Sequence, residues 1–231
     1  MALTSFSIKD VNVIVLGNFN PAILRHDFLV RECKISDLGQ VIEQSQLEFP
    51  TLLSHIKYKD IWWTAELNRM IVRDLSLSDK APYLLSKYLE MLPHTPLLAV
   101  GINLFADLVI SDFPVVTCNM LNTVSMFETL KKFEASHIYM TIKYQVVNEV
   151  SSIPIEFILT YITRHGARVL VQIELQKAPF LRAQYNWEIG DLHINRNRLQ
   201  IIQNEYRQIC DDFRDLMQDS LKSDQDSEEK K

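Results

Sequence analysis

Residues 137–177, HIYMTIKYQVVNEVSSIPIEFILTYITRHGARVLVQIELQK, carry the pattern that decides the fold. The stretch holds three runs in which β-branched and aromatic residues alternate with polar ones, as is typical of half-buried strands. Gly166 suits a short hairpin loop between the last two runs, and the SSIP segment supplies the other turn. We therefore predict a three-stranded antiparallel meander, with strands over 137–147, 154–163 and 168–177.

Other strand and helix patterns lie on both sides of this meander. The long apolar run LLAVGINLFADLVI indicates a central strand, and Gly101 within it marks a bend or bulge. Residues 180–191 are aromatic and are interpreted as irregular. The remaining predicted elements are a strand over 9–16, a short helix over 21–31, a hairpin over 57–73, a helix over 80–92, the central strand over 97–110, a short helix within 123–133 and a long helix from 192 or 195 to 221.

Together these elements predict an α+β fold, in which an antiparallel sheet is covered on one face by helices that include a long C-terminal helix. Residues 1–221 form a single domain. Its two halves, about 1–110 and 111–221, each contain a hairpin followed by a helix, so an internal duplication is one interpretation. Residues 222–231, KSDQDSEEKK, hold no apolar side chain and are expected to be a disordered acidic tail.

The stretch VIVLGNFNP at 13–21 begins like a phosphate-binding loop, because an apolar run ends in a glycine. Such loops need several free backbone N–H groups, usually more than one glycine, and often a lysine. Here Gly17 stands alone, and no lysine lies between residues 10 and 33. We interpret the stretch as a turn in which Asn20 caps a short helix and Pro21 occupies its first position.

The charge distribution argues against a nucleic-acid partner. The formal net charge of the 231 residues is −5, and residues 211–231 hold eight acids and four bases, which is −4. The rest of the chain is therefore near −1, and it lacks the basic surface that binding to a phosphate backbone requires.

The cysteines Cys33, Cys118 and Cys210 are odd in number and widely spaced, which is typical of reduced thiols in a cytoplasmic protein. The N-terminus has no signal-peptide pattern, and no apolar run approaches the length of a membrane span. We expect a cytoplasmic protein that makes no membrane contact and needs no cofactor.

The sequence contains no local catalytic or metal-binding motif. The six histidines are too far apart for a zinc motif, and the carboxylates Glu66, Asp107, Glu156 and Glu174 fit outward positions of a half-solvated sheet. His26 beside Asp27, and His165 between two arginines, are interpreted as solvated positions. No catalytic residue and no metal ligand is assigned.

The long C-terminal helix carries an apolar seam with spacings of three and four residues. The seam is too short for a coiled coil, so it packs across the sheet or pairs with a second copy of the chain. As candidate interaction residues it contributes Leu199, Ile202, Tyr206, Ile209, Phe213 and Leu216.

Trp62 and Trp63 are candidate exposed aromatic residues. Adjacent residues of a strand face opposite sides of a sheet, so one tryptophan enters the core and the other faces outward. We place Ile56, Tyr58 and Trp62 on one face. An outward tryptophan suggests contact with a partner, a ligand or a covering helix.

The segments VNVIVLGNFNP and LPHTPLLAVGIN, followed by a closing long helix, resemble a sporadically distributed group of uncharacterised bacterial proteins of similar length. The resemblance covers most of the chain and implies a bacterial, cytoplasmic α+β protein. No functional residue is carried over from it. A sporadic distribution suits an accessory gene, such as one from a mobile island or a phage-defence locus.

Our first hypothesis is a non-enzymatic accessory protein that acts as a subunit of a homodimer or of a hetero-oligomeric complex. The alternative is a small-molecule-binding cup between the sheet and the C-terminal helix. A third hypothesis is an enzyme with a dispersed site that includes His26 and His165. The aromatic residues proposed to line the cup are Trp63, Phe105, Tyr139, Tyr144, Phe157, Tyr161 and Tyr206.

Overall fold

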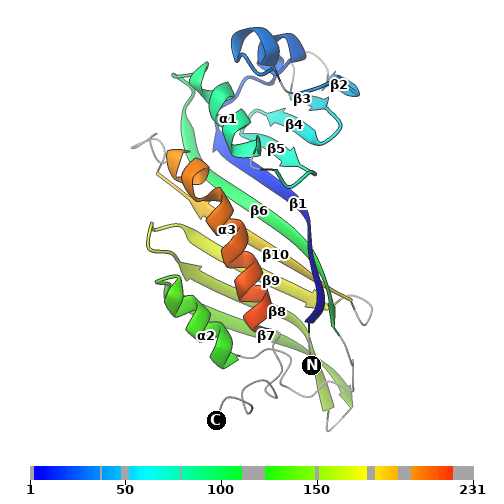
Figure 1. Ribbon diagram of the computed structural model, residues 1–231, viewed down its shortest axis with the longest axis vertical. Coiled ribbons are helices and arrows are strands. Elements are labelled where there is room, and N and C mark those ends of the chain that lie inside the picture. Colours follow the sequence, from blue (N-terminus) through cyan, green and yellow to red (C-terminus); the bar gives the residue numbers. More distant parts are fainter. Residues whose placement is uncertain are drawn as a thin grey trace. The chain divides into compact units, whose positions relative to one another are not determined.

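The computed structural model describes residues 3–36, 38–47, 52–78, 80–110, 123–148, 151–175, 180–191 and 199–220. Within these ranges the chain forms an antiparallel sheet and three α-helices, one of them C-terminal, in agreement with the predicted α+β class (Figure 1). The strand order is β2-β3-β4-β5-β1-β6-β10-β9-β8-β7.

The strands are β1 (Leu3–Gly17), β2 (Glu43–Leu47), β3 (Leu53–Lys57), β4 (Ile61–Glu66), β5 (Arg69–Asp74), β6 (Leu97–Ile110), β7 (Ser136–Asn148), β8 (Ser151–Ile162), β9 (Arg168–Leu175) and β10 (Phe180–Ile189). The α-helices are α1 (Lys80–Glu90), α2 (Thr123–Lys132) and α3 (Leu199–Ser220). Two short helical turns, η1 (Pro21–Ile23) and η2 (Phe28–Glu32), follow β1.

The chain divides into two compact units, each of which is built from segments that are not consecutive in the sequence. Unit 1 comprises Met1–Lys9, Leu104–Trp187 and Gln208–Lys231, and unit 2 comprises Asp10–Asn103 and Glu188–Arg207. The unit boundaries fall inside β1, β6, β10 and α3, whereas the halves expected from the sequence are consecutive.

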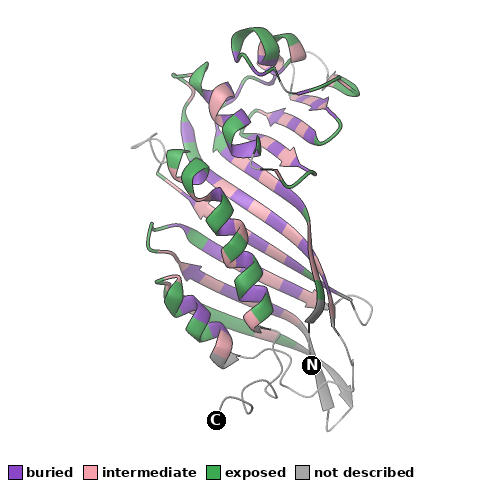
Figure 2. Ribbon diagram, in the orientation of Figure 1, coloured by how far each residue is buried: buried purple, intermediate pink, exposed green. Residues whose placement is uncertain are grey.

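In unit 2, buried and half-buried residues alternate along β3, β4 and β5 (Figure 2). The buried set includes Ile56, Trp63 and Val72, which are cross-strand neighbours. Helix α1 packs against this side, where the Tyr88 ring lies 5.8 Å from that of Trp63. The apolar stripe predicted on this helix is therefore its buried face, formed by Leu84, Leu85, Tyr88 and Leu89.

The loop after β1 is a turn, as its composition predicts. The backbone N–H groups of Gly17, Asn18 and Phe19 donate to the carbonyl oxygens of Asn68, Pro96 and Leu67 at 3.0, 3.0 and 2.9 Å. These N–H groups are therefore already used by the fold. The Asn20 side chain accepts a hydrogen bond from the Ala22 N–H, and Pro21 begins η1, so the predicted cap is confirmed. The single helix predicted over 21–31 was wrong, because η1 ends at Ile23 and η2 is a separate turn.

In unit 1, β8 pairs antiparallel with both β7 and β9. Helix α3 contributes Phe213, whose ring lies 5.2 Å from Tyr185 of β10 and 5.5 Å from Phe6 of β1. The Tyr161 and Tyr185 hydroxyls are hydrogen bonded at 3.1 Å. A hydrogen bond from the Thr129 hydroxyl to the Asp219 carboxylate joins α2 to α3.

Several predicted boundaries were wrong. Residues 180–189 are not irregular but form β10, and residues 151–154 begin β8 rather than forming a turn. The predicted hairpin over 57–73 is part of a longer antiparallel series that also contains β2 and β3. The predicted helix start at 192 or 195 and the acidic tail over 222–231 lie outside the described residues.

Candidate functional site

The side of the unit 2 sheet that faces away from α1 presents half-buried side chains from β1, β3, β4 and β5. We call this surface the open face. The register places its side chains in rows across the strands, because cross-strand partners share a face. One row is Lys57, Trp62, Arg73 and Asn12, and the next is His55, Thr64, Ile71 and Ile14.

Trp62 is held between two cations. The Lys57 Nζ lies 4.2 Å from the centroid of the Trp62 ring, and the Arg73 guanidinium carbon lies 4.7 Å from it. Both distances are within the range of cation–π attraction. The His55 ring meets Trp62 edge-on at 6.4 Å, and His55 Nδ1 lies 3.1 Å from the Thr64 hydroxyl. The indole is therefore fixed in one orientation on the open face.

Arg73, which is 38% exposed, also forms an ion pair with a mostly buried carboxylate. Its Nη2 lies 2.8 Å from Asp10 Oδ2, and the side chain of Asp10 is only 12% exposed. One further buried polar atom of each of Asp10, Arg73 and Trp62 has no hydrogen-bond partner within the described structure: Asp10 Oδ1, Arg73 Nε and Trp62 Nε1. Unpartnered buried polar atoms are uncommon in folded proteins, and they indicate a position where a water or a binding group completes the network.

The open face carries charges of both signs. Besides Arg73 and Asp10, the Arg69 Nη2 donates to Glu66 Oε1 at 2.7 Å, and this hydrogen bond raises the pKa of the Arg69 guanidinium. Lys57 stands opposite Glu43 of β2 in the register. Tryptophan and arginine are enriched in protein–protein contacts, whereas lysine, glutamate and aspartate are depleted there, so this surface combines both kinds of residue.

Of the two tryptophans singled out in the sequence, only Trp62 lies on the open face. Trp63 is fully buried on the α1 side, opposite Ile56. Ile56 and Tyr58 share the buried face as expected, but the placement of Trp62 with them was wrong. The chain turns between β3 and β4, where the Tyr58 N–H donates to the Ile61 carbonyl at 2.9 Å, and this turn shifts the alternation by one residue.

The seam of α3 is buried within the chain. The side chains of five of its six residues are at most 3% exposed: Ile202, Tyr206, Ile209, Phe213 and Leu216. Leu199 begins the helix. Phe213 packs beside Tyr185 and Phe6. Packing within the chain, which was one of the two alternatives for the seam, therefore accounts for this position.

The aromatic residues expected to line a cup do not share one environment. Trp63, Phe157, Tyr161 and Tyr206 are buried, whereas Tyr139 is 68% exposed on β7. Phe105 is half-buried between the buried neighbours Leu104 and Ala106, so it points to the other side of β6. The side chain of Tyr144 lies outside the described residues.

Several of the described carboxylates and histidines have local partners. Glu156 contacts Lys143 and accepts from Gln172 Nε2 at 2.6 Å, and the hydrogen bond from Lys143 lowers the pKa of Glu156. His26 Nδ1 lies 2.9 Å from the Tyr58 hydroxyl. Among the residues that the structure describes, no three His, Cys, Asp or Glu side chains come close enough to hold a metal ion.

Sequence reasoning missed Lys57, Arg73 and His55, which surround Trp62, and Asp10, which pairs with Arg73. Each occupies an outward position of a strand, but their association depends on the pairing of β1 with β5 and of β4 with β3. A period of two residues shows which face a side chain takes, and only the register shows which side chains are neighbours.

The chain matches no protein-family model, and no curated protein is similar enough in sequence to count as a relative. Within the described part of the chain, no helix has both the length and the apolar character needed to cross a membrane.

Proposed function

We propose that this protein is a non-enzymatic interaction protein that assembles through the open face of unit 2, with a second copy of the chain as its partner. The observation that carries the proposal is Trp62, held between Lys57 and Arg73 on a half-buried sheet surface. Tryptophan and arginine are enriched among the residues that dominate the binding energy of protein contacts. Tryptophan buries a large, rigid area, and the planar arginine guanidinium stacks on aromatic rings and pairs with carboxylates.

The charge pattern supports a second copy rather than a strongly charged partner. In a twofold symmetric contact the same patch occurs on both sides, so it must complement itself. The open face offers the cations Lys57, Arg69 and Arg73 and the acids Asp10, Glu43 and Glu66. We also infer that the helices cover only one face of the sheet, which leaves the other face available for such a contact.

The cellular setting belongs to the same proposal. A cytoplasmic, bacterial accessory role rests on the reduced cysteines and on the resemblance described above. This part of the proposal does not bear on which residues form the contact.

The test is sedimentation equilibrium of the full chain over a wide concentration range. We expect a species of twice the chain mass in the wild type. Trp62→Ala should weaken self-association at least about 30-fold, the equivalent of a hot spot of about 2 kcal/mol. Phe127→Ala is the matched control, because Phe127 is an aromatic residue of α2, 38% exposed and in unit 1. Circular dichroism and thermal unfolding should show that both variants remain folded.

Two outcomes would contradict the proposal. If Trp62→Ala dimerises as tightly as the wild type, the contact lies elsewhere on the chain. If the wild type is a monomer at every concentration, self-association is excluded. In that case, native mass spectrometry of the complex purified from its host would decide whether a different protein occupies the open face.

A further inference from the structure

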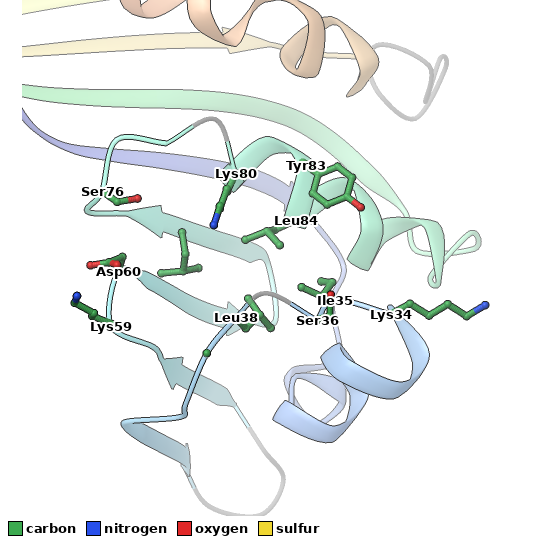
Figure 3. A pocket seen from close by; sticks show the side chains of 12 residues that line it. Lys34, Ile35, Ser36, Leu38, Lys59, Asp60, Ser76, Lys80, Tyr83 and Leu84 are labelled. Atoms are coloured by element: carbon green, nitrogen blue, oxygen red, sulfur yellow. The ribbon is translucent and has the colours of Figure 1, made fainter.

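Unit 2 contains a pocket of about 490 Å³ on the α1 side of its sheet, away from the open face. It is formed by residues 34–36, 38 and 39, the turn between β3 and β4, Ser76 after β5, and the first turn of α1 (Figure 3). Pockets that hold small organic molecules have volumes of about 300–1,000 Å³. The space is therefore large enough for a ligand of one or two rings.

The inner wall of the pocket is apolar. Ile35, Leu38, Ile61 and Leu84 line it, and each is at most 7% exposed, so these side chains are part of the unit 2 core. An apolar wall of this kind favours an apolar ligand body, because transfer of that body from water releases free energy in proportion to the buried area.

The rim of the pocket is polar and has more cations than anions. Lys34, Lys59 and Lys80 line it with a single described carboxylate, Asp60. Figure 3 shows that the Lys80 side chain points from the start of α1 into the space, whereas Lys34 points away from it. No described carboxylate forms an ion pair with Lys80. Its ammonium group is therefore placed to meet an acid group of a ligand.

The backbone at the pocket border is strained at two places. Lys34 has φ 55° and Leu77, which follows the lining residue Ser76, has φ 56°. This left-handed region is unfavourable for residues with bulky side chains, and such strain is often found at ligand-binding positions. Asp74 holds the second of these turns, because its carboxylate accepts from the Ser76 N–H and hydroxyl and from the Ser78 hydroxyl at 2.7–2.9 Å.

We propose that this pocket binds a small organic anion, with the acid group at the Lys80 ammonium and an apolar body against Ile61 and Leu84. The apolar wall accounts for the body, and the inward lysine accounts for the acid group. The site does not depend on assembly through the open face, so either proposal can fail without the other.

The experiment uses two fluorescent probes that share an apolar body. The first, 8-anilinonaphthalene-1-sulfonate, carries an acid group, and the second, N-phenyl-1-naphthylamine, lacks it. We expect saturable binding of both to the full chain. Lys80→Gln should lower the affinity for the sulfonate probe about two- to fivefold, which is the usual effect of losing a partly exposed ion pair. Lys80→Glu should lower this affinity further. Neither variant should change the affinity for the neutral probe.

Lys87→Gln is the matched control, since Lys87 lies on the same helix outside the pocket lining and pairs with Glu90 at 2.9 Å. Near-ultraviolet circular dichroism should be the same for all variants, which excludes probe binding to a loosened core. The proposal is overturned if the sulfonate does not bind saturably, if Lys80→Glu binds it as tightly as the wild type, or if Lys87→Gln weakens it equally.

Discussion

At the residue scale, Gly17 shows how a single position can be restricted by the chain that passes beside it. A Cβ atom on Gly17 would lie 2.5 Å from the Pro96 carbonyl oxygen, and the side chains of Phe19 and Leu97 would lie 3.2 and 3.3 Å away. The obstacle is backbone, which cannot move aside as the end of a flexible side chain can. Glycine is required here for close approach rather than for an unusual backbone angle.

Gly17→Ala should therefore lower the free energy of unfolding by about 1–3 kcal/mol, the usual cost of an overpacked position. Gly190→Ala is the control, because nothing lies within 4 Å of a Cβ atom at that glycine, and its effect should be within about 0.5 kcal/mol. Urea denaturation of both variants measures the difference. If the two variants were equally stable, the end of β1 at Gly17 and the segment near Pro96 would be able to move apart at little cost.

At the element scale, α3 is held by the same side chains that suggested a contact between chains. Phe213 is fully buried between Tyr185 and Phe6 in unit 1. Its removal would leave a cavity that the two remaining rings cannot fill without moving.

We expect Phe213→Ala to reduce the free energy of unfolding by about 3–5 kcal/mol, because it combines lost apolar transfer with a cavity. Gln203→Ala, at an exposed position of the same helix, should have little effect. Thermal unfolding followed by circular dichroism compares the two. A stable, fully folded Phe213→Ala variant would mean that α3 does not need this contact.

The elements also show where local pattern is sufficient. The predicted strand over 97–110 coincides with β6, because fourteen mostly apolar residues in a row suit a strand buried between neighbours. Its buried positions change from odd to even numbers between Ala99 and Val100, next to Gly101, where a bend or bulge was expected. Residues 180–189 were expected to be irregular, but they form β10, in which Leu181, Ala183, Tyr185, Trp187 and Ile189 are buried and alternate with polar residues.

At the scale of the whole molecule, the protein buries several groups that become negative at alkaline pH. Burial raises the pKa of the Cys33 thiol from 9.0 to about 12 and that of the Tyr58 phenol from 10.0 to about 12. It also raises the pKa values of Tyr88, Tyr161 and Tyr185. The folded state thus holds these protons more tightly than the unfolded chain does.

Stability from these groups is fully present below their ordinary pKa values and is lost as the pH rises from about 9 towards 12. We expect the melting temperature to be nearly constant from pH 7 to about 9 and to fall above that range. Tyr58→Phe should make the fall of the melting temperature with pH less steep between about pH 10 and 11. Tyr83→Phe, at a 54% exposed position, should leave it unchanged. A melting temperature that stays constant through this range would contradict the expectation.

The sequence by itself determined the α+β class, the span of β6, the presence of α1 to within two residues of its end, the cap at Asn20, and the alternation that makes one side of each strand apolar. These features depend on residues close together in the chain, so their physical causes are local. Tertiary structure alone decided that Trp63 rather than Trp62 is buried, that Arg73 meets Asp10, and that Lys80 points into a pocket. Each of these results depends on a turn or a strand register that joins distant residues, and a shift of one residue in either would exchange the two faces of the sheet.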